Sequence, residues 1–82
     1  MSYEKVMQAN NFIVGTKQTV KAIRNGLVKE VLVATDADTF VTAKVVSTAI
    51  EANIPITYVD SMNSLGKACG IQVAASTVAL TH

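Results

Sequence analysis

The sequence has few of the residues that build metal sites, disulfides and aromatic platforms. It contains one cysteine, Cys69, and one histidine, His82, which is the last residue. A lone cysteine cannot form an internal disulfide, and these two residues do not supply the ligands of a zinc site. Tryptophan is absent and aromatic residues make up only 5% of the chain, too few for a platform that stacks single-stranded bases. We therefore expect a cytoplasmic protein with no metal and no cofactor.

Long apolar runs are also missing. No segment approaches the roughly 18 consecutive apolar residues of a membrane span, and the polar N-terminus does not resemble a signal peptide. What is present is a chain of 82 residues that is 50% hydrophobic and carries a net charge of +1. This length predicts one domain, residues 1–82, and we expect a monomer. The small net charge argues against a general polyanion binder, so any nucleic-acid binding has to come from a local patch.

Helical and strand patterns alternate along the chain. The expected helices cover residues 3–10, 16–25, 38–53 and 61–70, and the expected strands cover residues 12–14, 30–35, 56–59 and 75–80. Residues 31–34 form a continuous apolar run, which is typical of a strand covered on both faces. The alternation predicts an α/β fold in which helices cover both faces of a central mixed sheet.

Apolar residues at helical spacing predict the buried face of each long helix. In the second helix the expected stripe consists of Val20, Ile23 and Leu27, and in the third it consists of Val41, Val45, Val46, Ala49 and Ile50. Polar residues before these stripes predict the helix starts, with Thr16, Asp38 or Thr39, and Ser61 as the expected caps. Gly26 and Gly70 are expected to end the second and fourth helices.

Positive charge concentrates in the second helix. Lys17, Lys21, Arg24 and Lys29 lie within thirteen positions, and no acidic residue falls between Gly15 and Lys29. Lys17, Lys21 and Arg24 share one face of the expected helix. The N-terminus of the same helix also offers free backbone N–H groups and the positive end of the helix dipole, which attract anions. Gln18 adds a donor and an acceptor suited to base edges. The pattern indicates an anion- and base-binding surface, although on the charge pattern alone a solvated lysine face is the simpler explanation.

Catalytic groups are scarce. Asp36 and Asp38 follow the buried strand, where phosphoacceptor or magnesium-binding carboxylates occur in doubly wound folds. A phosphoryl site also needs a second acidic pair and a lysine, and only Asp60 comes near that requirement, so helix capping by Asp38 is the simpler explanation. Cys69 shares an apolar helix face with Met62 and Leu65, and no internal histidine is present to activate it. We expect no enzymatic activity.

The segment from Leu65 to Ser76 is unusual in a second way. Gly66 lies inside a predicted helix, where glycine costs about 1 kcal/mol relative to alanine, so the small size of this residue is expected to be needed. Ile71 and Val73 follow in a short connection before the last strand. They either close the core or contact a flat apolar object such as an unstacked base.

Three ordered segments resemble a known family. They are Gly15-Thr16-Lys17-Gln18-Thr19-Val20-Lys21, then Ala34-Thr35-Asp36-Ala37-Asp38, then Leu65-Gly66-Lys67-Ala68-Cys69-Gly70-Ile71 with Val73-Ala74-Ala75. In order and spacing they resemble the kink-turn RNA-binding ribosomal-protein family, the L-seven-Ae / L-thirty-e / Gadd-forty-five-like superfamily, and in particular its bacterial L-seven-Ae-like ribosomal proteins. The resemblance implies a three-layer α-β-α sandwich with a central mixed four-stranded sheet.

The same resemblance implies a partner, which is structured RNA containing a kink-turn. This is a helix bent sharply at a three-nucleotide bulge beside tandem sheared G·A pairs, and the ribosome is one candidate source. The implied RNA-binding residues are Gly15, Thr16, Lys17, Gln18 and Lys21 at the G·A pairs, Ile71, Gln72, Val73 and Ala74 at the bulged nucleotides, and Asp38 at an extruded base, with Arg24 extending the basic face. Many members have Asn-Glu in place of Lys17-Gln18, and some have lysine in place of Met62 and proline in place of Thr39. The alternative is a regulatory or protein-interaction domain of the same superfamily that does not bind RNA.

Overall fold

The computed structural model describes residues 3–9 and 11–82, over which helices and strands alternate. The helices are α1 (Tyr3–Gln8), α2 (Thr16–Arg24), α3 (Thr39–Glu51) and α4 (Met62–Ala68), and the strands are β1 (Phe12–Val14), β2 (Val28–Ala34), β3 (Ile56–Val59) and β4 (Thr77–Thr81). The predicted order of elements is confirmed, although several ends differ. The first helix stops at Gln8, and Asn10, its predicted end, lies outside the described residues.

The four strands form one mixed sheet in the order β1-β4-β2-β3. Strands β2 and β3 are parallel, whereas β4 runs antiparallel to both β1 and β2. β4 begins at Thr77 rather than at Ala75 because the Ala75 N–H donates to the Met62 carbonyl of α4, 3.1 Å away, instead of joining the sheet. The last strand, β4, lies between β1 and β2, which are both distant from it in sequence. The order of the elements along the chain does not reveal this placement.

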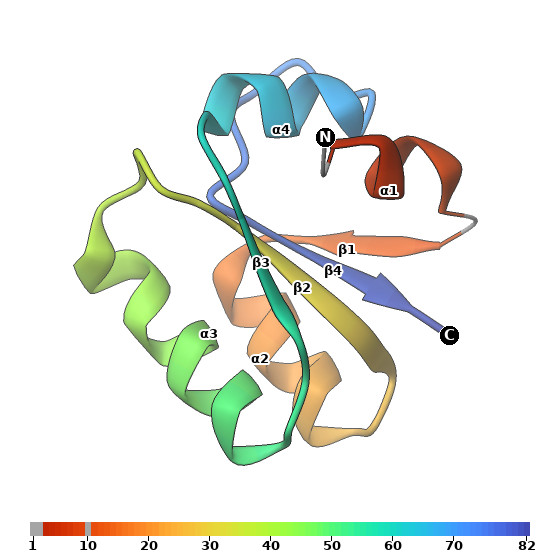
Figure 1. The fold of residues 1–82 in the computed structure, drawn as a ribbon, viewed down its shortest axis with the longest axis vertical. Helices are drawn as coiled ribbons and strands as arrows, with labels where there is room; N and C mark the ends of the chain where they lie inside the picture. Colours follow the sequence, from red (N-terminus) through yellow and green to blue (C-terminus); the bar gives the residue numbers. More distant parts are fainter. Residues whose placement is uncertain (1–2, 10) are drawn as a thin grey trace.

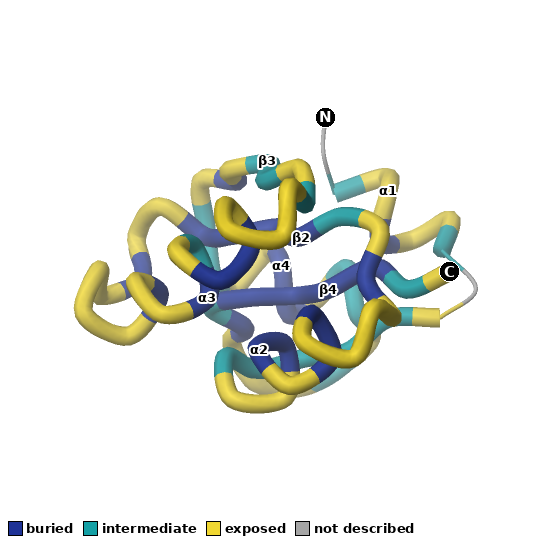
Figure 2. The backbone as a smooth tube through the Cα atoms, turned by 90° about the horizontal axis from the view of Figure 1, so that it is seen from below, coloured by how far each residue is buried: buried dark blue, intermediate teal, exposed yellow. Residues whose placement is uncertain are grey.

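Helices cover both faces of the sheet, as the alternation predicts. Figure 1 shows α1 and α4 on one face and α2 and α3 on the other. Successive residues of β2 alternate between the two cores, with Val31 and Val33 packing toward α2 and α3 and Leu32 packing toward α1 and α4. The central strands β2 and β4 are almost wholly buried (Figure 2). These layers confirm the three-layer α-β-α sandwich.

Three residues assigned to the core are exposed instead. Leu27 follows the end of α2, so the helical spacing no longer applies to it, and it is 51% exposed. Val41 and Ile50 on α3 are 46% and 64% exposed. Their places are taken by Thr42 and Thr48, which are buried. Threonine tolerates this burial because its hydroxyl donates to the helix backbone, as from Thr48 to the Lys44 carbonyl at 2.6 Å.

The helix caps agree with the sequence in two cases out of three. The Asp38 carboxylate accepts a hydrogen bond from the Phe40 N–H at 2.9 Å, and the Ser61 hydroxyl accepts one from the Ser64 N–H at 3.2 Å. The predicted cap at Thr16 is wrong. Thr16 is already the first residue of α2, and the capping position belongs to Gly15, which has no side chain to offer.

Removing the Asp38 cap is expected to lower the stability of the fold. Asp38→Ala leaves the first turn of α3 without its acceptor, which costs about 1 kcal/mol, equivalent to about 4–8 °C in the melting temperature of a domain of this size. Asp38→Asn retains a capping oxygen and should cost much less. Thermal unfolding of the three proteins measures the effect. Equal losses in both variants would show that the carboxylate acts through its charge and not through the cap.

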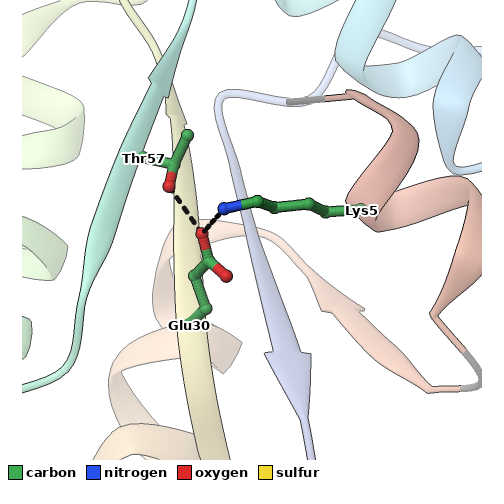
Figure 3. A network of polar contacts seen from close by, with 3 residues as sticks. All are labelled: Lys5, Glu30 and Thr57. Atoms are coloured by element: carbon green, nitrogen blue, oxygen red, sulfur yellow. Dashed lines mark hydrogen bonds and ion pairs between the residues drawn. The ribbon is translucent and has the colours of Figure 1, made fainter. Parts of the chain in front are cut away.

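Two side chains of α1, Tyr3 and Lys5, form polar contacts with the rest of the protein. At one end the Tyr3 hydroxyl donates to the Asp60 carboxylate and accepts from the Ser61 N–H at 3.1 Å. Further along, Lys5 Nζ lies 2.8 Å from Glu30 Oε2, and the Thr57 hydroxyl donates to the same oxygen at 2.5 Å (Figure 3). Burial would raise the pKa of Glu30, but these two hydrogen bonds outweigh it and lower the pKa. Their contribution to stability is therefore lost as the pH falls through that lowered value.

Candidate nucleic-acid interface

The turn between β1 and α2 exposes backbone at the start of the basic helix. Gly15 has φ 108° and ψ 149°, a conformation that is open essentially to glycine alone. Its N–H donates to the Thr77 carbonyl of β4 and its carbonyl accepts from the Thr19 N–H, both at 3.0 Å. A Cβ built on Gly15 would meet no atom within 4 Å. The backbone is thus held in place from inside, while its outer side is free for a ligand to approach.

The charged residues predicted on α2 do form one exposed face. Lys17, Gln18, Lys21 and Arg24 are all exposed, and none of their side chains forms a hydrogen bond or ion pair with another described residue. The first turn of α2 contains no acidic residue and no side-chain cap. Backbone N–H groups at such a helix start attract anions and hydrogen-bond acceptors. The electrostatics of this face suit a polyanion that also presents base edges.

Both aspartates after β2 have structural partners. Besides the capping bond of Asp38, Asp36 Oδ1 accepts a hydrogen bond from the Met62 N–H at the start of α4, at 2.9 Å. Asp36 thereby links the end of β2 to the fourth helix, and the Thr35 N–H joins the same end of β2 to β3 by donating to the Val59 carbonyl at 2.7 Å. In the described part of the chain, no three His, Cys, Asp or Glu residues are grouped in a way that could hold a metal.

The connection from α4 to β4 is held close to the helix. The Ile71 N–H donates to the Gly66 carbonyl at 3.1 Å, and a Cβ on Gly66 would lie only 2.1 Å from the Val73 carbonyl oxygen. The expected need for a small residue at Gly66 is confirmed. For Ile71 and Val73 the sequence left two alternatives open, packing in the core or contact with a base at the surface. Ile71 packs against the core, whereas Val73 is 69% exposed.

These three segments meet at one edge of the sheet. Just before and at the start of β4, the Ser76 carbonyl accepts from the Ala34 N–H of β2, and the Thr77 carbonyl accepts from the Gly15 N–H, each at 3.0 Å. Figure 1 shows the connections that follow β1 and β2 gathered around the start of β4. We call the exposed surface of residues 15–18, 36–38 and 72–74 the candidate edge. Arg24 lies outside it, at the far end of α2.

Two residues that the sequence did not single out lie near this surface. Lys44 of α3 lines an open groove of about 820 Å³ between α2 and α3, together with Lys17, Lys21 and Arg24. Phe40, next to the Asp38 cap, is 89% exposed. Their spacing of four residues on one helix is visible in the sequence. The packing of α3 against α2, which brings Lys44 to the basic face, is not.

Two further observations concern the reactivity of the Cys69 thiol and the length and polarity of the helices. Cys69 is partly buried, and this burial raises the pKa of its thiol, so the thiolate needed for reactivity is disfavoured. Over residues 3–9 and 11–82, every helix is too short or too polar to cross a membrane.

Comparison with known proteins places this geometry in context. Residues 2–82 match the profile of the ribosomal protein L7Ae/L30e/S12e/Gadd45 family. A protein of Geobacillus thermodenitrificans named "RNA-binding protein" is 58% identical over 80 residues, which is 98% of both chains. Among solved structures, a 15.5 kD RNA-binding protein of Giardia lamblia superposes with a TM-score of 0.84 at 22% identity, covering 98% of this chain and 68% of that one. A Bacillus halodurans protein of unknown function superposes with the same TM-score at 25% identity, covering 98% and 80%.

Proposed function

This chain belongs to the ribosomal protein L7Ae/L30e/S12e/Gadd45 family, and from that membership we propose that it is an RNA-binding protein that recognises and stabilises kink-turns. A relative that is 58% identical over nearly its whole length carries the name "RNA-binding protein", which supports an RNA partner. The natural RNA we propose is ribosomal or of the riboswitch type. The protein would act as a monomer in the cytoplasm, and binding requires no catalytic step.

One observation carries this proposal, namely that the three segments resembling the family's RNA-binding motifs meet at the candidate edge. Together they span residues 15–74 of the chain, yet the hydrogen bonds from Ala34 to Ser76 and from Gly15 to Thr77 hold the first two segments beside the start of β4. A bent RNA presents its G·A pairs and its bulge close together. A protein surface that contacts both has to be equally compact, as the candidate edge is.

The start of α2 is suited to the G·A pairs. Gly15 leaves room for close approach of an RNA backbone, and the N–H groups of the first helical turn can donate to phosphate or base oxygens. The Gln18 amide can donate to and accept from a base edge at once, and Lys21 lies on the same face one turn later. We assign Gln18 to base edges, and Lys17 and Lys21 to guanine edges and phosphates.

The remaining two segments are suited to unstacked nucleotides. Gln72, Val73 and Ala74 are exposed on a connection that is anchored at both ends, so they can contact bulged bases at a low entropic cost. Asp38 uses Oδ1 to cap α3, which leaves its other carboxylate oxygen to accept from an extruded base. Ile71, which packs against the core, would support this connection more than it contacts RNA.

A rigid surface of this kind would act by shifting a population. A free kink-turn exchanges between extended and bent forms, and a protein that fits only the bent form increases its share in proportion to its preference for that form. RNA shape would supply most of the selectivity, and each good contact to a base edge would add about 1–3 kcal/mol. The protein contributes preorganisation, since its contacting residues are already held before RNA arrives.

The direct test is a titration of a kink-turn hairpin against a hairpin in which both G·A pairs are replaced by G·C pairs. The parent protein should bind the first more tightly. Gln18→Ala should weaken that binding by about 5- to 150-fold, corresponding to about 1–3 kcal/mol. Lys21→Ala should weaken binding to both hairpins and lower the slope of affinity against salt by about one unit.

Lys67→Ala is the matched control, because Lys67 is equally exposed but lies on α4, in the opposite helical layer. It should bind as the parent does. The site assignment is wrong if Gln18→Ala and Lys21→Ala also bind like the parent. Kink-turn recognition itself is wrong if the parent binds both hairpins equally.

A further inference from the structure

The basic surface of α2 continues beyond the candidate edge into the groove between α2 and α3, and the proposed function gives no role to Lys44 on the second wall of this groove. The cationic residues that line this α2–α3 groove are Lys17, Lys21 and Arg24 of α2 and Lys44 of α3. Four of its lining residues are cationic and none is acidic. Within the described part of the chain, none of the four cations forms an ion pair. In a protein with a net charge of +1, this is an uncompensated positive site.

The direction of the groove follows from the topology. β1 and β2 both run antiparallel to β4, so they run parallel to each other, and the helices that follow them both start at the candidate edge. The groove therefore leads away from that edge between the two helices. Lys17 and Arg24 are separated by about 10 Å along the axis of α2, and Lys44 reaches the groove from the opposite wall.

Further along, the character of the groove changes. Arg24 and Lys44 also line a smaller hollow next to it, whose other lining residues include Ser47 and Glu51. Glu51 is acidic, whereas no lining residue of the α2–α3 groove is. Its negative charge makes the smaller hollow less favourable for a polyanion than the groove. The positive track is thus bounded by the candidate edge at one end and by Glu51 at the other.

We propose that the α2–α3 groove holds the phosphate backbone of the RNA stem that continues from the G·A pairs, with Lys44 and Arg24 neutralising phosphates beyond the kink-turn itself. This inference rests on the proposed function, which places the G·A pairs at the start of α2. An RNA stem leaving those pairs has to pass one side of α2. The groove is the side on which the cations lie, and Lys44 adds a contact from a second helix.

An RNA backbone fits this groove better than an acidic protein segment does. The groove is continuous with the surface proposed to hold the kink-turn, because Lys17 and Lys21 belong to both. Its charges are flexible lysines and one arginine on an open surface, and two apolar side chains line it, Val20, which is buried, and Val41, which is 46% exposed. Such a surface favours evenly spaced phosphates, whereas a protein helix would need an apolar seam to dock.

The experiment compares two kink-turn hairpins closed by the same loop. In the short-stem hairpin, the stem that carries the G·A pairs ends just beyond them, and in the long-stem hairpin it is extended by a full helical turn. The parent should bind the long-stem hairpin about three- to tenfold more tightly at low salt. Lys44→Ala should abolish most of that difference and lower the salt slope for the long stem by about one unit. Lys67→Ala should behave as the parent does.

Each alternative result has a definite meaning. Equal affinity of the parent for both stems would overturn the inference and leave the groove to another partner, such as an acidic protein. Equal weakening of both hairpins by Lys44→Ala would also overturn it, because Lys44 would then act at the kink-turn and not on the stem. Neither result would touch the proposed function, which fails only if replacing the G·A pairs by G·C pairs makes no difference to the parent.

Discussion

Gly66→Ala is expected to lower both the stability of this protein and its affinity for RNA, although alanine is the better helix former. The added Cβ would lie 2.1 Å from the Val73 carbonyl oxygen and 3.3 Å from Ala74 Cα. Both are backbone atoms, so no side-chain rotation relieves the clash. Helix propensity favours alanine by about 1 kcal/mol, but forced overpacking costs about 1–3 kcal/mol and at times more. Because a contact of 2.1 Å is far inside van der Waals distance, we take the upper end of that range and expect a net loss of about 2 kcal/mol, or about 8–16 °C in melting temperature.

The effect on RNA binding follows from where the clash lies. To accommodate the methyl group, the connection at Val73 and Ala74 has to move away from α4, and these residues are the ones proposed to contact bulged nucleotides. We expect kink-turn affinity to fall by about tenfold or more, equivalent to at least about 1.4 kcal/mol. Thermal unfolding and hairpin titration measure the two effects separately.

Lys67→Ala again provides the comparison, because it changes the adjacent residue of α4 without adding an atom near Val73. It should leave both the melting temperature and the affinity close to those of the parent. If Gly66→Ala were as stable as the parent and bound RNA as tightly, the close packing of α4 against its following connection would not be required for either property.

The second large effect is expected at Gly15, for a conformational reason. Its φ of 108° and ψ of 149° lie in a region that costs other residues about 1–3 kcal/mol. No atom lies within 4 Å of a Cβ built there, so Gly15→Ala strains the backbone without creating a clash inside the protein. The methyl group would instead project from the surface where we propose that an RNA backbone approaches. Affinity should fall by about tenfold or more, beyond what the lost stability explains.

Gly26→Ala is the matched control for that experiment. Gly26 also has a positive φ, 72°, with open space around a built Cβ, but it follows the other end of α2. It should lose about 1–2 kcal/mol of stability through the same kind of strain and retain the affinity of the parent for a short-stem kink-turn. Equal losses of affinity in the two variants would show that Gly15 matters for folding and not for contact with RNA.

Local signals in the sequence were sufficient for much of the fold. The alternation of elements and the caps at Asp38 and Ser61 depend on neighbours within a few positions, and the sequence predicts them. It also predicts the size requirement at Gly66, from the cost of glycine inside a helix, although the atoms that impose it belong to Val73 and Ala74 on the next connection. The spacing of apolar residues was a poorer guide to burial in α3, because it predicts a wider buried face than the neighbouring elements cover. Val41 and Ile50 are exposed because the buried neighbours of α3 in its core cluster, which come from α2 and the sheet, pack against the stripe at Val45 and Ala49.

The candidate interface divides in the same way. The exposed basic face of α2 was predicted from the spacing of Lys17, Lys21 and Arg24, because helical periodicity alone places them on one side. The sequence could not assign Ile71 to the core and Val73 to the surface, since both are apolar residues in an irregular connection. Only the hydrogen bonds that tie this connection to α4 decide which of the two side chains turns inward.

By itself, the sequence determined the order of the elements, a local excess of positive charge at a helix start, and the scarcity of catalytic groups. Only the tertiary structure decided that β4 lies between β1 and β2 and thereby brings residues 15–18, 36–38 and 72–74 to one edge. It also decided that Lys44 faces the basic side of α2 across a groove. The physical reason is that charge and periodicity are local properties of a chain, whereas strand order and helix packing depend on contacts between residues distant in sequence.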